Sequence, residues 1–524
     1  MDFLFHHLLE GSVSRYPDEE ALVHGEERLT YAQVSSRVQG LASGLRKAGI
    51  QRGERVGIYL DASIAQVVSI FGVSQAGGVF VPINTVLFPE QVAHIAADCS
   101  ISGLITTRAK LESLLPVLSA IPSLRFFVIL SDDTALPTDV AQYSFEMMTT
   151  GKADVACPDQ GIEKDLVAIL YTSGSTGKPK GVMLSHANIM AGASIVSTYL
   201  GITSSERILA VLPFTFDDGL NQLTTAFQQG ATLVLINFVF AKQIVDVLIR
   251  ERITGLAGIP TVWSLLAQPS STLSHNMPPM LRYITNTGGA MPQNVLESLR
   301  RMLPNTRVVL MYGLTEAFRS TYLPPEELER RPTSMGKAIP DTEILVLNEQ
   351  GQMCKPGEVG ELVHRGPTVS MGYWGNPEAT NRVLKPNPLL PPELGDVERV
   401  CYSGDLVKMD EDGFLYFVGR RDAMIKSSGI RISPTEVEEV AFQSGKVRHV
   451  AAIGIPDPLL GQVVKLFIVP RDNETVDENA VLAFCEEKMP RYMVPKFLEV
   501  VPELPKTSSG KIDYPALRRR EGIA

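Results

Sequence analysis

Short apolar segments alternate with segments of helical spacing over the first 130 residues. Between residues 31 and 48, valine and leucine recur at helical spacing, and Thr30 stands before them as the expected N-cap. A second helical segment covers residues 63–76. The apolar runs around these segments predict strands at residues 55–60, 79–83, 104–107 and 127–130. Strands that alternate with helices favour a largely parallel sheet covered by helices on both faces.

The same alternation returns between residues 186 and 311, with strands expected at residues 207–212, 232–236 and 308–311. The most apolar run, Ala231–Phe240, is expected to be a buried strand, because it has about half the length that a membrane span needs. From about residue 335 to 421, strands separated by glycine and proline turns predict a smaller β-rich subdomain.

The last hundred or so residues predict a further α/β unit. Its helices are expected at residues 434–444 and 478–488, and its strands at residues 449–455, 463–469 and 497–501. We therefore expect an α/β protein with two domains. A large N-terminal domain of doubly covered sheets spans residues 1–421 and includes the β-rich subdomain, and a small mobile C-terminal α+β domain spans residues 422–524.

Composition narrows the class without naming a chemistry. The 524 residues are 44% hydrophobic and 20% charged, which is typical of a globular protein with roughly two to four domains. The net charge of −10 speaks against binding to nucleic acid or to an anionic membrane. Five dispersed cysteines without a CxxC pair indicate neither a disulfide framework nor a zinc knuckle. The N-terminus does not resemble a signal peptide, so we expect a cytoplasmic protein without a membrane span.

A glycine-rich segment, Thr172–Gly181, follows an apolar strand and carries the first chemical signal. Glycines turn backbone N–H groups toward an anion, and hydroxyls and lysines add donors and charge. Pro179 follows Lys178, so the segment is not a Walker A loop; it joins two strands, and a helix is expected after Ser185. A flexible surface hairpin is the alternative. The candidate phosphate-binding residues are Thr172, Ser173, Gly174, Ser175, Thr176, Gly177, Lys178 and Lys180.

The segment Tyr171–Gly181 resembles the signature of the adenylate-forming superfamily, which includes acyl-CoA synthetases, peptide-synthetase adenylation domains and firefly luciferase. The resemblance extends from Leu29-Thr-Tyr to Gly510-Lys-Ile-Asp, with the motifs in the order of the family. It implies an AMP-forming acid–thiol ligase. Such an enzyme uses ATP and Mg²⁺ to convert a carboxylic acid to acyl-AMP, and then passes the acyl group to a pantetheine thiol.

The resemblance also implies roles for residues in four further motifs. The segment Asn286–Met291 resembles the loop along the adenine and the acyl pocket, and a strand-ending turn is its alternative reading. The nucleotide-binding residues implied in these motifs are Gly289, Ala290, Met291, Tyr312, Gly313, Asp405 and Arg420, with Asp405 and Arg420 at the ribose. Thr315 is implied to contact the α-phosphate and Glu316 to hold Mg²⁺, where the alternative is a Thr-Glu pair that caps a helix.

The C-terminal region matches the family at positions implied to move or to catalyse. Asp422 matches the hinge, Gly429 the path of the thiol, and Arg431 a residue that meets phosphate. An ordinary charged hairpin is the alternative for the segment that carries Gly429 and Arg431. Lys511 matches the catalytic lysine that bridges the substrate carboxylate and the α-phosphate, where a positive charge stabilises the transition state.

The segment Pro213–Gln222 departs from most acyl-CoA synthetases, because Phe216 stands where many of them have histidine. Its Phe-x-Phe-Asp run resembles amino-acid-activating domains, in which the aspartate that matches Asp217 binds the substrate ammonium. A buried carboxylate needs a cationic partner, which favours an amino acid or amino-bearing acid as substrate. The alternative is that Asp217 or Asp218 caps the helix expected from Gly219. Further pocket candidates are Asn221, Thr287 and Gly288, followed by Gly258 and Thr285.

No segment resembles a carrier attachment site, so the thiol is expected from coenzyme A or from a separate acyl or peptidyl carrier protein. The main alternative is an acyl-CoA ligase for a fatty, aryl or other non-amino acid. A luciferase-like oxygenase is a second alternative. A non-catalytic nucleotide-binding protein is disfavoured, because Glu316, Asp405, Arg420 and Lys511 are all present.

Overall fold

The computed structural model describes residues 2–130, 136–151, 157–159, 161–172, 179–395, 397–421, 423–427, 430–458, 460–471, 476–507 and 510–523. For Lys426, Ile430 and Arg431 it describes the backbone alone.

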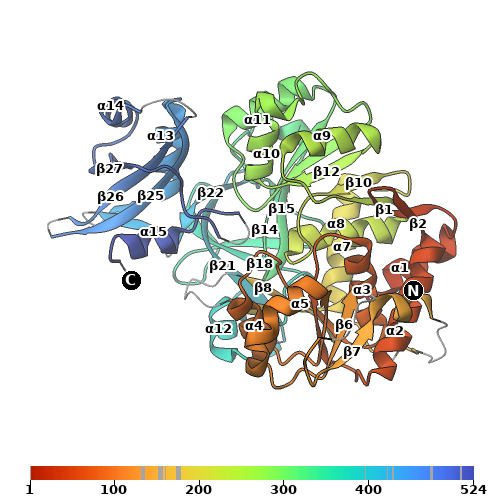
Figure 1. The fold of residues 1–524 in the computed structure, drawn as a ribbon. Helices are drawn as coiled ribbons and strands as arrows, with labels where there is room; N and C mark the ends of the chain where they lie inside the picture. Colours follow the sequence, from red (N-terminus) through yellow and green to blue (C-terminus); the bar gives the residue numbers. More distant parts are fainter. Residues whose placement is uncertain are drawn as a thin grey trace.

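Two large mixed sheets form the N-terminal part of the described chain (Figure 1). The first has nine strands, in spatial order β16 (Lys337–Ala338), β15 (Ala317–Leu323), β14 (Arg307–Leu314), β13 (Tyr283–Asn286), β12 (Gly255–Gly258), β10 (Arg207–Ala210), β11 (Thr232–Leu235), β1 (Glu20–His24) and β2 (Glu27–Thr30). The second has eight strands, in the order β19 (Gly372–Tyr373), β9 (Lys180–Ser185), β8 (Leu166–Thr172), β4 (Val79–Pro82), β3 (Arg55–Tyr59), β5 (Gly103–Thr107), β6 (Phe126–Leu130) and β7 (Ala141–Ser144).

Two smaller sheets follow along the described chain. One contains β17 (Glu343–Leu347), β18 (Val359–Arg365), β21 (Arg399–Met409), β20 (Leu384–Pro386) and β22 (Leu415–Arg420). The other contains β24 (Ile430–Ile432), β23 (Ile425–Ser427), β26 (Gly461–Pro470), β25 (Val447–Asp457) and β27 (Phe497–Val500), and it lies in blue beside the large part in Figure 1. The expected α/β fold with a large N-terminal and a small C-terminal part is confirmed.

Fifteen α-helices occur in the described part of the chain, and they include every helix predicted above. In the large part they are α1 (His7–Arg15), α2 (Tyr31–Lys47), α3 (Ile64–Gln75), α4 (Pro89–Asp98), α5 (Arg108–Leu114), α6 (Phe145–Thr150), α7 (His186–Leu200), α8 (Asp217–Gln229), α9 (Ala241–Arg250), α10 (Pro260–Leu266), α11 (Gln293–Met302) and α12 (Pro377–Val383). In the small part they are α13 (Pro434–Gln443), α14 (Glu478–Lys488) and α15 (Tyr514–Arg520). None of the described helices combines the length and apolar composition of a membrane span.

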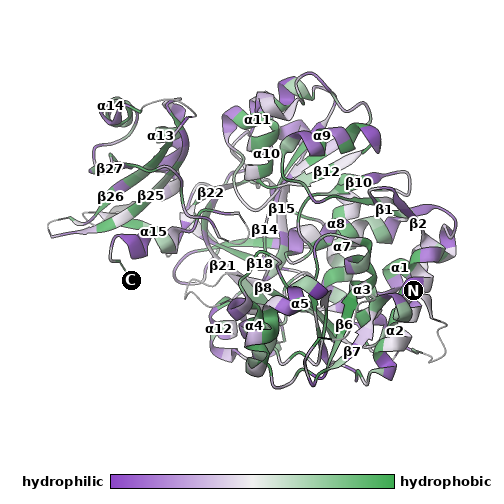
Figure 2. Ribbon diagram, in the orientation of Figure 1, coloured by the Kyte–Doolittle hydropathy of each residue, from purple (hydrophilic) through white to green (hydrophobic). Residues whose placement is uncertain are grey.

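The main hydrophobic core lies between the two large sheets. One cluster of buried residues takes members from strands of both sheets and from α2, α3, α7 and α8. Phe71 of α3 stacks at 4.9 Å on Phe227 of α8, so these helices pack against each other inside the layered structure. The amino-acid composition of the helices agrees with this packing. In Figure 2, hydrophobic residues lie along α3, and hydrophilic residues lie along much of α9.

Two helices begin at the residues that the sequence predicts, each with a side-chain N-cap. Thr30 Oγ1 accepts a hydrogen bond of 3.3 Å from the backbone N–H of Gln33 and begins α2. Ser185 caps α7 in the same way, with a distance of 3.1 Å to the backbone nitrogen of Asn188. These caps fix where each helix starts, and α7 therefore leaves directly from the end of β9.

The expectation of a strand over the whole run Ala231–Phe240 is wrong beyond Leu235. The strand β11 ends there, and Val239 and Phe240 are 78% and 69% exposed. After the sheet edge the chain turns away, and Asn237 Nδ2 donates a hydrogen bond of 2.9 Å to the carbonyl oxygen of Ala62.

Candidate active site

The hairpin of β8 and β9 carries the glycine-rich segment. The strands pair antiparallel, with Thr172 opposite Lys180 at the end of the hairpin, as predicted for a segment between two strands. The predicted residues Ser173–Lys178 lie outside the described residues. Lys180 Nζ lies 5.5 Å from the ring centre of Tyr373, on the strand β19 that pairs with β9. The hairpin is thus joined to the segment that carries Tyr373.

Thr315 and Glu316 form the turn between β14 and β15. Gly313 allows this turn to be tight, because a Cβ there would lie 2.8 Å from the backbone nitrogen of Arg319. The Glu316 carboxylate accepts a hydrogen bond of 2.5 Å from the Tyr373 hydroxyl. The structure therefore places the expected magnesium ligand next to the β9 hairpin, although neither motif is near the other in sequence.

The predicted ribose pair is assembled by strand register. Asp405 of β21 lies opposite Arg420 of β22, and Arg420 Nη1 lies 2.9 Å from Asp405 Oδ1. The Tyr312 hydroxyl donates a hydrogen bond to the same carboxylate, so burial and the neighbouring Asp405 both raise the pKa of Tyr312. The Ser403 hydroxyl accepts a hydrogen bond of 3.0 Å from the Asp405 backbone N–H.

The loop after β13 and the loop that carries Lys511 meet at Gly288. Gly288 has a φ of +75°, and a Cβ there would lie 3.4 Å from Lys511 Cε and 3.7 Å from Asp218 Oδ2. Asn286 Nδ2 donates a hydrogen bond of 2.8 Å to the carbonyl of Gly289, which holds the loop in place. Lys511 thus reaches the N-terminal part from the small C-terminal part.

Asp217 and Asp218 begin α8, and neither caps it; the N-cap position is Phe216, without a side-chain hydrogen bond. The expectation of an aspartate cap is therefore wrong. Both carboxylates point instead to partners on other strands. Thr315 Oγ1 donates to Asp217 at 2.9 Å, and Arg319 of β15 forms an ion pair with Asp218.

The buried Asp217 and the partly buried Asp218 lie beside one internal cation. The Arg319 side chain is 2% exposed. Burial and the negative charge of Asp218 raise the pKa of Asp217 to about 6, while Arg319 acts against this rise. Burial, the largest single influence, would lower the pKa of Arg319, but Asp218 together with Tyr199 and Asp217 outweighs it, and the pKa is raised. The protein thus supplies its own counter-ion for Asp218, beside the buried Asp217.

A small cavity of about 10 Å³ lies between α7, α8 and β15, which is about the space for one water molecule. Its lining contains two of the predicted pocket residues, Asp217 and Asn221, and the unpredicted Phe318. Thr287 also belongs to the site, because its hydroxyl donates to Asp218 at 3.0 Å. Phe216 is half-buried and does not line this cavity.

The remaining predicted residues take peripheral or undescribed positions. Ala290 is exposed and Met291 packs against the core below α10. Gly258 faces the Trp263 ring, and Thr285 is buried. Asp422 and Gly429, and the side chain of Arg431, lie outside the described residues.

Sequence reasoning missed Phe318, Arg319 and Tyr373. The sequence could have predicted Arg319, because a single arginine within an otherwise uncharged strand indicates a buried acidic partner. Tyr373 and Phe318 could not have been predicted in this way, because aromatic residues in strands are typical of any core.

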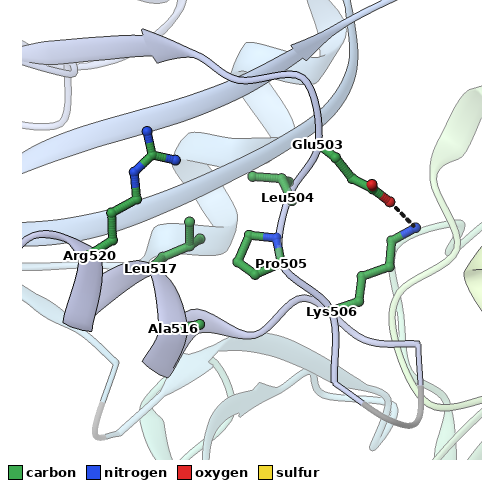
Figure 3. A pocket seen from close by; sticks show the side chains of 7 residues that line it. All are labelled: Glu503, Leu504, Pro505, Lys506, Ala516, Leu517 and Arg520. Atoms are coloured by element: carbon green, nitrogen blue, oxygen red, sulfur yellow. Dashed lines mark ion pairs between the residues drawn. The ribbon is translucent and has the colours of Figure 1, made fainter. Parts of the chain in front are cut away.

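A larger hollow of about 480 Å³ lies on the small C-terminal part (Figure 3). It opens between the segment Glu503–Lys506 and α15. The Lys506 Nζ atom lies 3.8 Å from Glu503 Oε1, and the Arg520 guanidinium forms an ion pair with Glu499. Both cationic side chains that line the hollow therefore already have carboxylate partners. None of the predicted site residues lines it, and we do not assign the active site to it.

His6, His7 and Asp159 form a cluster of potential metal ligands near the N-terminus. His7 Nδ1 accepts backbone N–H bonds from Phe3 and Leu4 at 3.1 and 3.2 Å, so its Nε2 carries the proton and donates to Asp159 at 2.9 Å. A metal at Nε2 would require these bonds to break. We therefore interpret the cluster as a set of structural hydrogen bonds that hold the segment with His6 and His7 against Asp159.

Comparison with known proteins identifies the family. Residues 9–374 match the AMP-binding enzymes, and residues 436–511 match the C-terminal domain of these enzymes. The chain belongs to the AMP-binding enzyme family. The predicted resemblance to adenylate-forming enzymes is therefore confirmed, and so is the expected activity of an AMP-forming acid–thiol ligase.

Similar AMP-binding enzymes act on several acids. A feruloyl-CoA synthase of Amycolatopsis sp is 32% identical over 97% of this chain and 96% of its own, and an indoleacetate–CoA ligase of Aromatoleum aromaticum is 31% identical over 95% and 94%. The anthranilate CoA ligase AuaEII in complex with anthranoyl-AMP matches with a TM-score of 0.89 and 26% identity over 100% of this chain and 98% of that one. The feruloyl-CoA and indoleacetate–CoA enzymes favour the alternative expectation of an acyl-CoA ligase for a non-amino acid, whereas anthranilate is an amino-bearing acid. None of the three supports the expectation of an amino acid passed to a carrier protein.

Proposed function

We propose that this AMP-binding enzyme is an acyl-CoA ligase for a non-amino carboxylic acid. The observation that carries this proposal is the Arg319–Asp218 ion pair beside Asp217. An ammonium-binding carboxylate should lack an internal cation, and here the cation belongs to the protein. A feruloyl-CoA synthase and an indoleacetate–CoA ligase among the similar enzymes support an aryl acid as substrate.

In the proposed reaction the substrate carboxylate attacks the α-phosphorus of ATP and releases pyrophosphate. Lys511 would lie beside both reacting groups and stabilise the negative charge that develops, and Thr315 would donate a hydrogen bond to the α-phosphate. Glu316 would hold Mg²⁺, which neutralises phosphate charge when bound. A single carboxylate near a phosphate-binding hairpin fits the preference of Mg²⁺ for one or two carboxylates together with phosphate oxygens.

In the second proposed step the thiol of CoA displaces AMP from the acyl group. Residues 1–421 and 422–524 would then act as two domains that rotate about Asp422, and this rotation would bring Gly429 and Arg431 to the site. Two observations support separate domains. Two hydrophobic clusters consist of residues after position 424 alone, and the Lys511 loop contacts the large part through Gly510 near Ile259.

Matched acids test the proposed substrate class. ATP–pyrophosphate exchange and CoA thioester formation should be measured with indole-3-propanoate against tryptophan and with 3-phenylpropanoate against phenylalanine, because the members of each pair differ only in the α-ammonium group. We expect activity with the acids that lack it. Exchange stimulated only by the amino acids would contradict the proposal.

The role of Lys511 is tested by separating the two half-reactions. Lys511→Ala should abolish pyrophosphate exchange and leave thioester formation from added acyl-AMP nearly unchanged. Lys506→Ala is the matched control, because this exposed lysine lies on the same loop with its own partner Glu503. Exchange unaffected by Lys511→Ala would remove this lysine from the mechanism.

A further inference from the structure

Arg319 lies at the centre of a network that the proposed mechanism does not use. Its Nη1 donates hydrogen bonds to Asp218 Oδ1 and, at 2.7 Å, to Thr287 Oγ1. Its backbone has a φ of +56°, and Gly313 gives it room, because any Cβ there would collide with the Arg319 backbone. The close approach of the β14 backbone at Gly313 and the β15 backbone at Arg319 therefore directs the buried guanidinium toward Asp218.

Asp218 lies where it can compete for the catalytic lysine. Its Oδ2 atom accepts no hydrogen bond from the residues that the structure describes. This atom and Lys511 Cε both lie within 4 Å of the position that a Cβ on Gly288 would take. The lysine arm and the carboxylate thus approach each other across a glycine that leaves the space between them open.

An uncompensated carboxylate at this place would attract the Lys511 ammonium, whose carbon chain already lies beside the same glycine. The ammonium would then be drawn away from the substrate carboxylate and the α-phosphate. Arg319 prevents this, because its charge already satisfies Asp218 from the opposite side. We infer that Arg319 is a positioning residue for adenylation, which keeps the Lys511 ammonium available by neutralising Asp218. The inference rests on the role proposed for Lys511.

Two variants test the inference against a purely structural role. Arg319→Met removes the cation at similar length, and Arg319→Met with Asp218→Asn removes both charges. We expect the single variant to lose about 100-fold in pyrophosphate exchange, a loss typical of one misplaced electrostatic group. Thioester formation from added acyl-AMP should fall less than about threefold, because that step does not need Lys511. The double variant should recover exchange to within about tenfold of the wild type, since the competing charge is gone.

A control removes the cation that pairs with another buried carboxylate, although this arginine side chain is itself 46% exposed. Arg282 pairs with the buried Glu206 just before β13, at the end of this strand away from Gly288. Arg282→Met should lower thermal stability without changing the ratio of the two half-reactions.

The outcomes separate the inference from the proposed function. Equal loss of both half-reactions in Arg319→Met, or a double variant no better than the single one, would overturn the inference. If Arg319→Met does not fold, the double variant decides alone, because a buried ion pair is often replaceable as a unit. Near wild-type exchange then supports the inference, and lost exchange with intact thioester formation refutes it. Failure of the proposed role of Lys511 shows separately, as unchanged exchange in Lys511→Ala.

Discussion

The contact between Phe318 and Gly192 limits the small cavity beside Asp217. Phe318 lines the cavity, and its ring lies on α7 so closely that a Cβ on Gly192 would be 2.2 Å from Phe318 Cε1. Ordinary carbon contacts need about 3.5 Å or more, so Gly192→Ala has to move the ring by over an ångström. We expect part of this movement to enter the cavity, which has room for about one water molecule.

The expected magnitude follows from the volume involved. One methylene in an apolar substrate pocket changes kcat/KM by roughly 10- to 200-fold. Gly192→Ala should therefore lower kcat/KM for the largest accepted acid by about that factor relative to the smallest. Overpacking should also cost about 1–3 kcal/mol of stability. Phe318→Ala should do the reverse, with larger acids favoured and a stability loss of about 3–5 kcal/mol, because the Phe318 ring is buried.

Pyrophosphate exchange with benzoate, phenylacetate and 3-phenylpropanoate measures the effect, since these acids differ by one methylene each. When Gly192→Ala and Phe318→Ala are combined, the new methyl group occupies space that the phenyl ring has left. The effects of the two substitutions on acid preference should therefore not be additive. Gly11→Ala is the control, because a Cβ at this helical glycine meets only the flexible Asp2 carboxylate, at 3.0 Å. An acid preference unchanged within twofold in both Gly192→Ala and Phe318→Ala would refute the reasoning.

Three further predictions concern other contacts. Tyr373→Phe removes the hydroxyl that orients Glu316, and should raise the Mg²⁺ concentration for half-maximal exchange by about tenfold or more, measured by Mg²⁺ titration; unchanged Mg²⁺ dependence would contradict it. His364 is buried and neutral, with its pKa lowered to about 3 by burial, so the unfolded chain binds a proton that the native protein refuses as the pH falls below about 6.5. His364→Gln should therefore lose less unfolding free energy than the wild type between pH 7 and pH 5 in urea titrations, whereas exposed His275→Gln should track the wild type. Thr30→Ala should cost about 1 kcal/mol of unfolding free energy by loss of the α2 cap, and no measurable loss would show that the cap is dispensable.

Features that depend on neighbours along the chain were predictable. Thr30 and Ser185 start their helices because a hydroxyl reaches a backbone N–H three residues later, a contact that needs no other part of the fold. The strand–turn–strand form around the glycine-rich segment follows in the same way from Pro179 and the flanking apolar runs. The run Ala231–Phe240 misled for a related reason, because hydrophobicity alone does not show where a strand leaves its sheet.

The partners of the functional side chains could not be predicted, because each comes from a distant strand. Tyr312 meets Asp405, and Tyr373 meets Glu316, only after the order and register of the sheets are set. The interpretation of Asp217 as an ammonium site was made without these partners, and it stays a prediction. It was sound chemistry for an isolated buried carboxylate, and it omitted Arg319, whose position depends on the close approach of β15 to Gly313.

The sequence by itself determined the family, the order of the motifs and the class of reaction, because those rest on residue types and spacing. Tertiary structure decided which charges neutralise one another and how small the cavity beside Asp217 is. Coulomb interactions and steric contacts depend on distances through space, and a buried arginine 101 residues from its aspartate leaves no record of that distance in the chain.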